Sequence, residues 1–583
     1  MHLSKEDTGM QCRLLLIAAL LSASVVWAQD MESPSYDIGT PVVQDIWVNP
    51  IGGNDGNSGN TSNQALRTIT AAWNRIPQGQ TLTNTGYRVR LLPGSHTSIP
   101  NYWESRYGTA LRPIIFQAEG APGSAVLPDP NIFDCRYLYF IGIHFDKPFS
   151  GGDAFHLEQC ENVLLRNCTV SGHTFAQEGI KVNQSQHIYI EDCDISGADD
   201  NAIDFVAVQY GHIVRSKIHD AADWVLYVKG GSAYITIDGN EVYDSSGNGG
   251  ITAGQGTGFE FMTNPWLHNE AYDIKIVNNL IHDTYGAGLG VNGGYNILMA
   301  YNTLVRIGQR SHVIEVVHGR RGCDGDSAAC ESNRVAGGWG TAGAEAQYIP
   351  NRNVYIFNNI VYNPAPYQSE WQHFAIAGNV TPPRTSNVAS PAAADDNLRI
   401  CGNLIWNGPQ NLSVLGDSSG CQNGNPTCNE AQLLANNQIN TLFPQFVNAS
   451  NGDFRPAITG NIFNAVTYPI PAFPGGDRPA PPVQPTGVLD NTVPHERTGY
   501  PRYARHRPPG AYTGGSSMRM EQIAPDTVGL RAERGYRYAI DASSDVKSWA
   551  PVAVMSNATE TLLQVPVSAT NEIRHYRARL LPP

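Results

Sequence analysis

The feature that most constrains the fold of this chain is a degenerate repeat of short apolar segments, each followed by a turn. The segments LYFI, VLLR, IYIE, HIVR and YITI begin at residues 138, 163, 188, 212 and 234, and DIKI, NILM, VYIF and LRIC begin at 273, 296, 354 and 398. The first five recur every 22 to 25 residues, and insertions lengthen most of the later intervals. Alternating apolar residues predict strands, and such a period is typical of solenoids. The repeat therefore predicts an all-β chain folded as a parallel β-helix.

A column of polar residues keeps the same register as the repeat. Two positions before a recurring aliphatic residue stand Cys168, Cys193, Ser216, Asn240, Asn279, Asn302, Asn359 and Asn403. Strands in adjacent coils lie about 4.8 Å apart, so stacked asparagine amides can hydrogen-bond from one coil to the next. We expect an internal asparagine ladder. The same register stacks Cys135 on Cys160, and Cys168 on Cys193, either as disulfides or as buried thiols.

Composition narrows the class of partner. The net charge is −14 and only 15% of residues are charged, which argues against a nucleic-acid-binding protein, because phosphate binding needs a broad basic face. An anionic sugar is still possible as a substrate, since one local basic cleft is enough to attract it.

The first 28 residues have the pattern of a secretory signal peptide. Lys5 and Arg13 precede an apolar stretch that ends in a small-residue cleavage site at Ala28, and we expect no transmembrane segment after it. Export to the extracellular space or the periplasm permits disulfides. Cys323 with Cys330, and Cys421 with Cys428, are spaced as local loop staples. We expect an exported monomer.

The chain divides into two parts after the signal peptide. Residues 29–513 are expected to form the solenoid, with a Pro-rich tether at about 471–487. The segment Ile46 to Trp73 resembles the entry of secreted right-handed parallel β-helix proteins, in which a short helix, here beginning near Leu66, caps the open end. Residues 453–465 and 498–512 resemble their closing segments. Residues 518–583, with YRYAID, APVAVM, TLLQVPV and RHYRARL, predict a small β-domain that resembles C-terminal modules of exported bacterial proteins.

A second set of strands runs through the middle of the repeat and carries the candidate chemistry. The strands GIKVN, AIDFV, VLYVK, GITAG, GLGVN and VIEVV align so that one column holds Lys181, Asp204, Tyr227, Thr252, Gly290 and Glu315. A second column, two residues further on, includes Asn183 and Lys229. Alternation along a strand puts both columns on the outward face, which we expect to be solvent-exposed.

Carboxylates gather just before this face. Asp199 and Asp200 stand in a turn, Asp204 follows on the strand, and Glu178 lies one coil below. Clustered carboxylate oxygens are the ligands that Ca²⁺ prefers. The alternative is that the aspartate pair only initiates a turn and is solvated.

The sequence ADDNAIDF, followed one coil later by VLYVKGG, is similar to pectate-lyase-like β-helix enzymes, especially family nine polysaccharide lyases. The resemblance implies Ca²⁺ on Asp199, Asp200 and Asp204, with Glu178 as a possible fourth ligand from the register. It implies Lys229 as the base that removes a sugar proton. The third aspartate is one residue further from the pair than in that family.

The resemblance implies a secreted lyase that cleaves an acidic, uronate-containing polysaccharide by calcium-assisted β-elimination. Calcium stabilises the charge that develops on the substrate carboxylate. Arg320 and Arg321 are candidates for clamping a second carboxylate in a bidentate manner, and Tyr227 is a candidate proton donor. Three alternatives stay open, namely a uronan epimerase, a glycoside hydrolase, and a non-catalytic carbohydrate-binding or surface β-helix protein.

Overall fold

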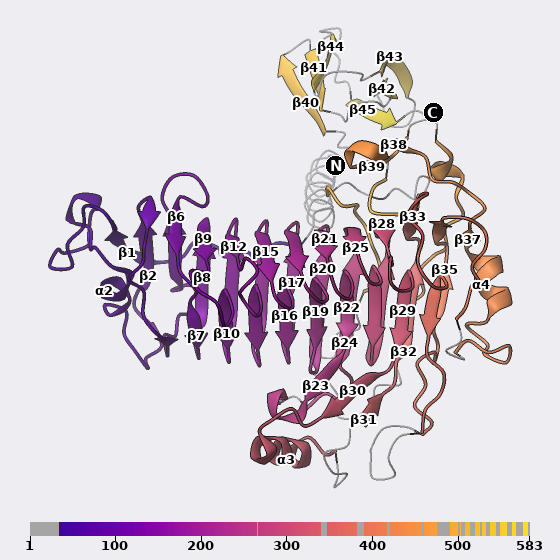
Figure 1. Ribbon diagram of the computed structural model, residues 1–583. Coiled ribbons are helices and arrows are strands. Elements are labelled where there is room, and N and C mark those ends of the chain that lie inside the picture. Colours follow the sequence, from indigo (N-terminus) through magenta and orange to yellow (C-terminus); the bar gives the residue numbers. More distant parts are fainter. Residues whose placement is uncertain are drawn as a thin grey trace, which may run out of the picture.

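The computed structural model describes residues 34–580, apart from 265, 340–346, 382–389, 417–419, 458–459, 475–489, 500–501, 503–507, 514–518, 525–526, 532–536, 544–548, 557–561 and 567–574. Within these ranges the chain is a right-handed parallel β-helix, as the repeat predicts, built from three long parallel sheets that run side by side along the solenoid (Figure 1). The expected signal peptide and most of the expected tether lie outside the described residues.

The recurring apolar segments lie within the strands of sheet A. Its order is β1 (Val43–Val48), β2 (Gly86–Leu91), β5 (Ile114–Ala118), β8 (Arg136–Ile141), β11 (Glu161–Arg166), β14 (Gln186–Glu191), β17 (Gln209–Val214), β20 (Ser232–Asp238), β24 (Ala271–Val277), β27 (Gly294–Ala300), β32 (Arg352–Phe357) and β35 (Arg399–Cys401).

Sheet B follows sheet A in each coil after a tight turn. Its order is β3 (Gly94–Ser95), β6 (Ala125–Leu127), β9 (Ile143–Asp146), β12 (Thr169–Ser171), β15 (Asp194–Ala198), β18 (Lys217–Ala221), β21 (Glu241–Ser245), β25 (Leu280–Thr284), β28 (Thr303–Ile307), β33 (Ile360–Asn363), β36 (Leu404–Asn407) and β37 (Gln438–Ile439).

Sheet C closes each coil and carries the candidate site. Its order is β4 (Trp103–Glu104), β7 (Asn131–Phe133), β10 (Phe155–Glu158), β13 (Ile180–Asn183), β16 (Ile203–Val206), β19 (Leu226–Lys229), β22 (Ile251–Gly254), β26 (Leu289–Asn292), β29 (Ile314–Val317) and β34 (Phe374–Ile376). Aliphatic side chains from all three sheets fill the interior of the solenoid.

The predicted asparagine ladder is confirmed at the turn from sheet A to sheet B. Each amide nitrogen donates to the Oδ1 of the next coil, from Asn240 to Asn279 at 3.0 Å, then through Asn302 and Asn359 to Asn403. The ladder extends one step further, to Asn437, at 2.8 Å. The residue before each rung from Asn240 to Asn403 adopts a left-handed conformation, as Asn278 (φ 57°) and Asn358 (φ 56°) do. Identical turns therefore stack, and buried amides satisfy one another.

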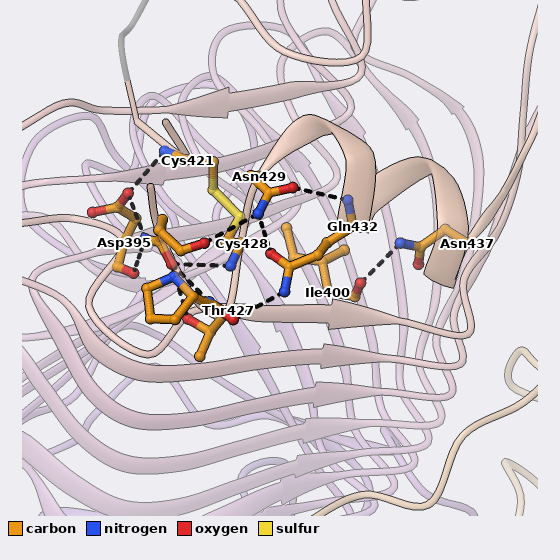
Figure 2. Close-up of a disulfide and its surroundings, with 10 residues drawn as sticks. Asp395, Ile400, Cys421, Thr427, Cys428, Asn429, Gln432 and Asn437 are labelled. Atoms are coloured by element: carbon orange, nitrogen blue, oxygen red, sulfur yellow. Dashed lines mark hydrogen bonds between the residues drawn. A yellow bond between two sulfur atoms is a disulfide. The ribbon is translucent and has the colours of Figure 1, made fainter. Parts of the chain in front are cut away.

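Both ends of the solenoid are capped. Helix α2 (Ile69–Trp73) begins close to the predicted position and buries Ile69, Ala72 and Trp73 against the first coils. Helix α4 (Glu430–Asn436) lies at the other end, where the predicted Cys421–Cys428 disulfide holds the loop before it (Figure 2). Asn437 Nδ2 donates to the Ile400 carbonyl at 2.8 Å and joins this cap to the last coil.

The outer face of sheet A is crossed by two segments from opposite ends of the chain. Tyr36 stacks on Tyr189 with ring centroids 4.4 Å apart, and its backbone N–H donates to Glu191 Oε1 at 2.5 Å. Further along the sheet, His495 pairs with Asp238 at 2.6 Å. Arg502 Nη2 donates to Asn278 Oδ1 at 2.7 Å, and the Ala511 backbone N–H donates to Thr303 Oγ1 on the neighbouring sheet B at 2.9 Å.

Two insertions project side by side beyond the ends of the sheet C strands (Figure 1). The first contains β23 (Gly256–Gly258) and η2 (Phe259–Phe261), and the second contains β30 (Gly319–Gly322), α3 (Ser327–Ala336) and β31 (Gln347–Ile349). The predicted Cys323–Cys330 disulfide staples the second insertion. Cys135, Cys160, Cys168 and Cys193 are stacked as the register predicts and are free buried thiols.

The C-terminal region forms antiparallel β-structure. A short hairpin of β38 (Phe446–Asn448) and β39 (Asp453–Pro456) precedes it, with the short helices η3 (Ala449–Asn451) and η4 (Asn461–Asn464) nearby, and η1 (Ser62–Gln64) lies in the entry loop. Two three-stranded sheets follow, made of β40 (Arg519–Ala524), β41 (Thr527–Arg531) and β44 (Leu562–Pro566), and of β42 (Arg537–Ser543), β43 (Ala550–Ser556) and β45 (His575–Leu580). Among the described residues, no helix has the length and apolarity needed to cross a bilayer.

Candidate functional site on sheet C

The register of sheet C places the predicted column in adjacent coils. Lys181 on β13 pairs with Asp204 on β16, which pairs with Tyr227 on β19. The column continues through Thr252 and Gly290 to Glu315. Lys229 lies two residues after Tyr227 and opposite Val206. The sequence repeat thus predicts which side chains are neighbours.

The expectation that this column is solvent-exposed is wrong for its central members. Asp204 and Thr252 are fully buried and Tyr227 is 3% exposed. The indole of Trp224 packs with Tyr227 and lies over Gly290, where a Cβ would meet the ring at 2.6 Å. Glycine at this position makes room for the indole, which covers this part of the sheet. Lys181 and Lys229 remain partly exposed at either side.

Lys181 is the centre of a buried charge cluster. Its Nζ is ion-paired with Asp204 and lies 3.4 Å from Glu178 Oε1. The second oxygen of Glu178 accepts the Asn201 backbone N–H at 2.9 Å. Glu178 is 2% exposed, and burial, reinforced by Asp204, raises the pKa of its carboxyl. Burial alone would lower the pKa of Lys181, but the charges of Asp204 and Glu178 raise it. The lysine therefore stays an ammonium ion.

Lys229 is a partly exposed amine beside the cluster. Its Nζ donates to Tyr227 Oη at 2.8 Å and lies 4.2 Å from the centroid of the same ring. Burial raises the pKa of Tyr227, and the nearby carboxylates of Asp204 and Glu178 raise it further. Tyr227 is consequently a neutral phenol that holds the amine at the outer end of the column. Because Tyr227 is buried, it positions Lys229 and does not reach a leaving group.

Asp199 and Asp200 lie at the turn before β16, at the edge of this cluster. They line a hollow of about 600 Å³. Asp200 stacks on Asp223 of the next coil, whose carboxylate accepts from Asn248. Burial raises the pKa of Asp200, and the charge of Asp223 adds to this effect.

The residues predicted to bind calcium do not fit a calcium site. Glu178 and Asp204 surround the Lys181 ammonium, which takes the position that a metal ion would need, whereas Asp199 and Asp200 face the hollow. In the described part of the chain, no three His, Cys, Asp or Glu side chains converge on a common position for a metal ion. The predicted calcium site and the structure differ because the register of sheet C stacks Lys181 directly against Asp204.

The two arginines predicted as a clamp point to opposite sides of β30. Arg321 is fully buried, with Nη1 3.0 Å from Glu270 Oε1 and Nη2 donating to the Asn269 carbonyl at 3.0 Å. It anchors the second insertion and does not contact a substrate, so its predicted clamp role is not supported. Arg320 is exposed and lies over the Tyr348 ring at 5.5 Å.

One functional candidate was missed by the sequence analysis. His156 on β10 lies next to Lys181 in the same column, one coil below it. Its Nδ1 is 2.7 Å from Asp153 Oδ2, and its Nε2 is 3.7 Å from Glu158 Oε2. Burial would lower the pKa of His156, but bonds to these carboxylates raise it to about 9. Extending the aligned column by one coil would have revealed this third cation.

Comparisons with known proteins agree with this architecture. The family model of the right-handed β-helix region matches residues 131–265, which include Glu178, Lys181, Asp204, Tyr227 and Lys229. No curated protein matches the sequence of this chain.

The solved structures that resemble the chain have several activities. A rhamnogalacturonan lyase is 12% identical with a TM-score of 0.36, covering 62% of this chain and 87% of its own. A mannuronan C-5 epimerase A-module from Azotobacter vinelandii is 11% identical with a TM-score of 0.35, covering 56% and 86%. A surface adhesin of Streptococcus pneumoniae is 11% identical with a TM-score of 0.33, covering 58% and 80%. What this chain has in common with them is the parallel β-helix fold.

Proposed function

We propose that this protein is a secreted polysaccharide lyase that cleaves an acidic, uronate-containing polysaccharide by β-elimination, with Lys229 as the base. The observation that carries the proposal is the Lys229–Tyr227 pair, in which a partly exposed amine is fixed at 2.8 Å from a neutral, buried phenol. A base held in one orientation on a rigid sheet suits proton abstraction.

The reaction requires one base and one source of positive charge. As the base, Lys229 Nζ takes the proton from the carbon beside the uronate carboxylate, and the electron pair forms a carbon–carbon double bond as the bond to the leaving sugar oxygen breaks. The leaving oxygen takes a proton from solvent. Negative charge that develops on the carboxylate needs a nearby cation. The Lys181 ammonium, whose side chain is 20% exposed, supplies it two coils away.

The central test is the formation of unsaturated sugar ends, measured by ultraviolet absorbance on a panel of pectate, alginate, ulvan and glycosaminoglycans. Lys229→Ala should lower kcat at least about 1,000-fold, as expected when the essential base is removed. The matched control is Lys217→Ala, which removes an exposed lysine of sheet B and should retain full activity. Reducing ends without the absorbance would contradict the lyase, as would inverted uronates in an uncut polymer or binding without any product.

A chelator separates this mechanism from the calcium-assisted one. Since Lys181 occupies the space between Glu178 and Asp204, we expect activity to survive removal of divalent cations. Activity that disappears with chelator and returns only with Ca²⁺ would show that the cluster rearranges around a metal.

One observation favours a second candidate, a glycoside hydrolase. Asp200 and Asp223 are carboxyls in adjacent coils, and the pKa of Asp200 is raised by burial and by Asp223. Paired carboxyls with different protonation states are the machinery of glycoside hydrolysis. In that case Asp200→Asn would abolish the release of reducing ends, whereas Lys229→Ala would not.

A further inference from the structure

The hollow in front of the turn between sheets B and C belongs to no step of the proposed reaction. Three consecutive coils build it, and its lining consists of Ser150, Gly151, Gly152, Thr174, Phe175, Gln177, Asp199 and Asp200. Backbone hydrogen bonds join the coils, from Gly151 to Phe175 at 3.0 Å and from Asp199 to Ala176 at 2.8 Å. The hollow is therefore preformed by the solenoid.

Exposed aromatic side chains mark one side of this hollow. Phe175 is 37% exposed and Phe149, next to Ser150 in the chain, is 77% exposed. His173 stacks on Phe175 with ring centroids 5.1 Å apart, and its Nε2 is fixed by Asp146 Oδ1 at 2.8 Å. An aromatic ring that is supported on one face and open on the other offers a stacking surface for an apolar ligand face, such as the C–H face of a pyranose.

The charged groups that line the hollow are the carboxylates of Asp199 and Asp200, beside the neutral side chains of Ser150, Thr174 and Gln177. Within the described part of the chain, the Asp199 and Asp200 carboxylates make no hydrogen bond or ion pair with another side chain. The eight lining residues include no lysine, arginine or histidine. Sugar hydroxyls can donate to such carboxylates in charge-assisted hydrogen bonds. A uronate would be repelled by them, since like charges placed together are disfavoured.

The hollow and the base are neighbouring positions. Asp200 stands in the turn before Asp204 of β16, and Lys229 lies one coil further on, near enough for the charges of Asp200 and Lys229 to interact. A sugar in the hollow is thus a neighbour of the reacting unit and not the reacting unit itself.

We propose that the hollow is a subsite for a neutral pyranose of the substrate. This inference rests on the proposed lyase function and narrows its substrate class. The polysaccharide is a heteropolymer in which neutral sugars accompany the uronate, because the proton-removing site offers the lysines Lys229 and Lys181, whereas the charged residues that line the hollow are Asp199 and Asp200.

Binding to the full chain carrying Lys229→Ala tests the subsite without turnover. Isothermal titration would use xylo-, galacto-, manno- and arabino-oligosaccharides against oligogalacturonate and oligomannuronate of equal length. We expect one of the neutral series to bind, with an affinity that is independent of salt and chelator. Adding Phe175→Ala should weaken binding about tenfold, and Asp199→Asn should weaken it as well. The matched control, Phe443→Ala, removes a 42% exposed phenylalanine elsewhere and should leave the affinity unchanged.

Three results would overturn the subsite. The first is that the homouronates bind at least as tightly as the neutral oligosaccharides and that Phe175→Ala weakens this binding. The second is that binding of the neutral oligosaccharides requires Ca²⁺. The third is that Phe175→Ala leaves the affinity for the neutral oligosaccharides unchanged. The lyase proposal is tested in a separate experiment, which measures whether the wild-type protein forms unsaturated product. The subsite can therefore fail while the lyase stands, and the lyase can fail while the subsite stands.

Discussion

Two polar columns run along this solenoid, and they are built on opposite principles. The inner column repeats one residue, so each asparagine from Asn240 to Asn437 satisfies the next with the same amide geometry. The outer column of sheet C changes residue at every coil, from His156 through Lys181 and Asp204 to Tyr227. Repetition gives a column that is complete in itself. In the outer column the residue type varies, so each charged side chain depends on a particular neighbour to balance its charge. The amine of Lys229 lies at the edge of this column.

The largest expected effect comes from breaking the outer column at its cation. Lys181→Met leaves the fully buried Asp204 carboxylate unpaired and should lower the free energy of unfolding by about 3–5 kcal/mol. Urea unfolding measures the loss. The double variant Lys181→Met with Asp204→Leu should recover most of it, and equal losses in the single and double variants would show that the ion pair is not the cause.

A smaller loss is expected when the inner column is interrupted. Asn302→Ala removes an amide that bonds Asn359 Oδ1 and the Ile276 carbonyl, both buried, so unfolding should become easier by about 2–3 kcal/mol. Activity per folded molecule should not change. The control Asn423→Ala, at an exposed loop position, should stay within about 0.5 kcal/mol of the wild type. A loss of activity without a loss of stability would contradict a purely structural ladder.

The lower end of the outer column should add a pH dependence that the asparagine ladder lacks. His156 titrates at about 9 in the folded chain, against about 6.5 when unfolded. Its protonated form therefore stabilises the fold fully below about pH 6.5, and this stabilisation is lost as the pH rises through about 9. His156→Gln should cost about 1–2 kcal/mol at pH 6 and almost nothing at pH 9.5. Thermal unfolding at the two pH values would show the difference, and an equal cost at both would rule out this titration.

The smallest expected effect on stability sharpens the contrast between structural and reactive groups. Lys229→Met keeps the aliphatic stem on the Tyr227 ring and removes the amine that donates to the Tyr227 hydroxyl, so the free energy of unfolding should fall by at most about 1 kcal/mol. Its activity should nevertheless be lost. A large destabilisation would mean that Lys229 is another structural member of the outer column.

The part of this architecture that could be predicted is the part set by the repeat. Recurring strands fix which residues stack even though the coils differ in length, so the sequence correctly predicts the asparagine ladder and the Lys181–Asp204–Tyr227 column. The two loop disulfides were predicted from the spacing of their cysteines. Four of the strands in the C-terminal region are also found close to their predicted positions, whereas β40 and β41 were not predicted. That this region is a separate domain stays a prediction.

The features that could not be predicted depend on contacts between side chains that belong to different coils. The burial of Tyr227 involves the Trp224 indole, which fits only because Gly290 has no side chain. The predicted calcium ligands were grouped by their spacing along the chain. The aligned column already placed Lys181 beside Asp204, and this contact argued for a resident ammonium ion. Arg321 could have been separated from Arg320 by the alternation of side chains along a strand.

The segment around Tyr36 has a consequence for how the chain acquires its structure. In a solenoid each repeat touches only the repeats beside it, and such arrays can fray from either end. Tyr36 binds residues from the coils of Tyr139, Arg166 and Glu191, and the carbonyl of Pro34 accepts from Arg215. Although it is made early in synthesis, this segment can dock only after four later windings have formed. It then ties them together, so that they melt as one cooperative block and not winding by winding.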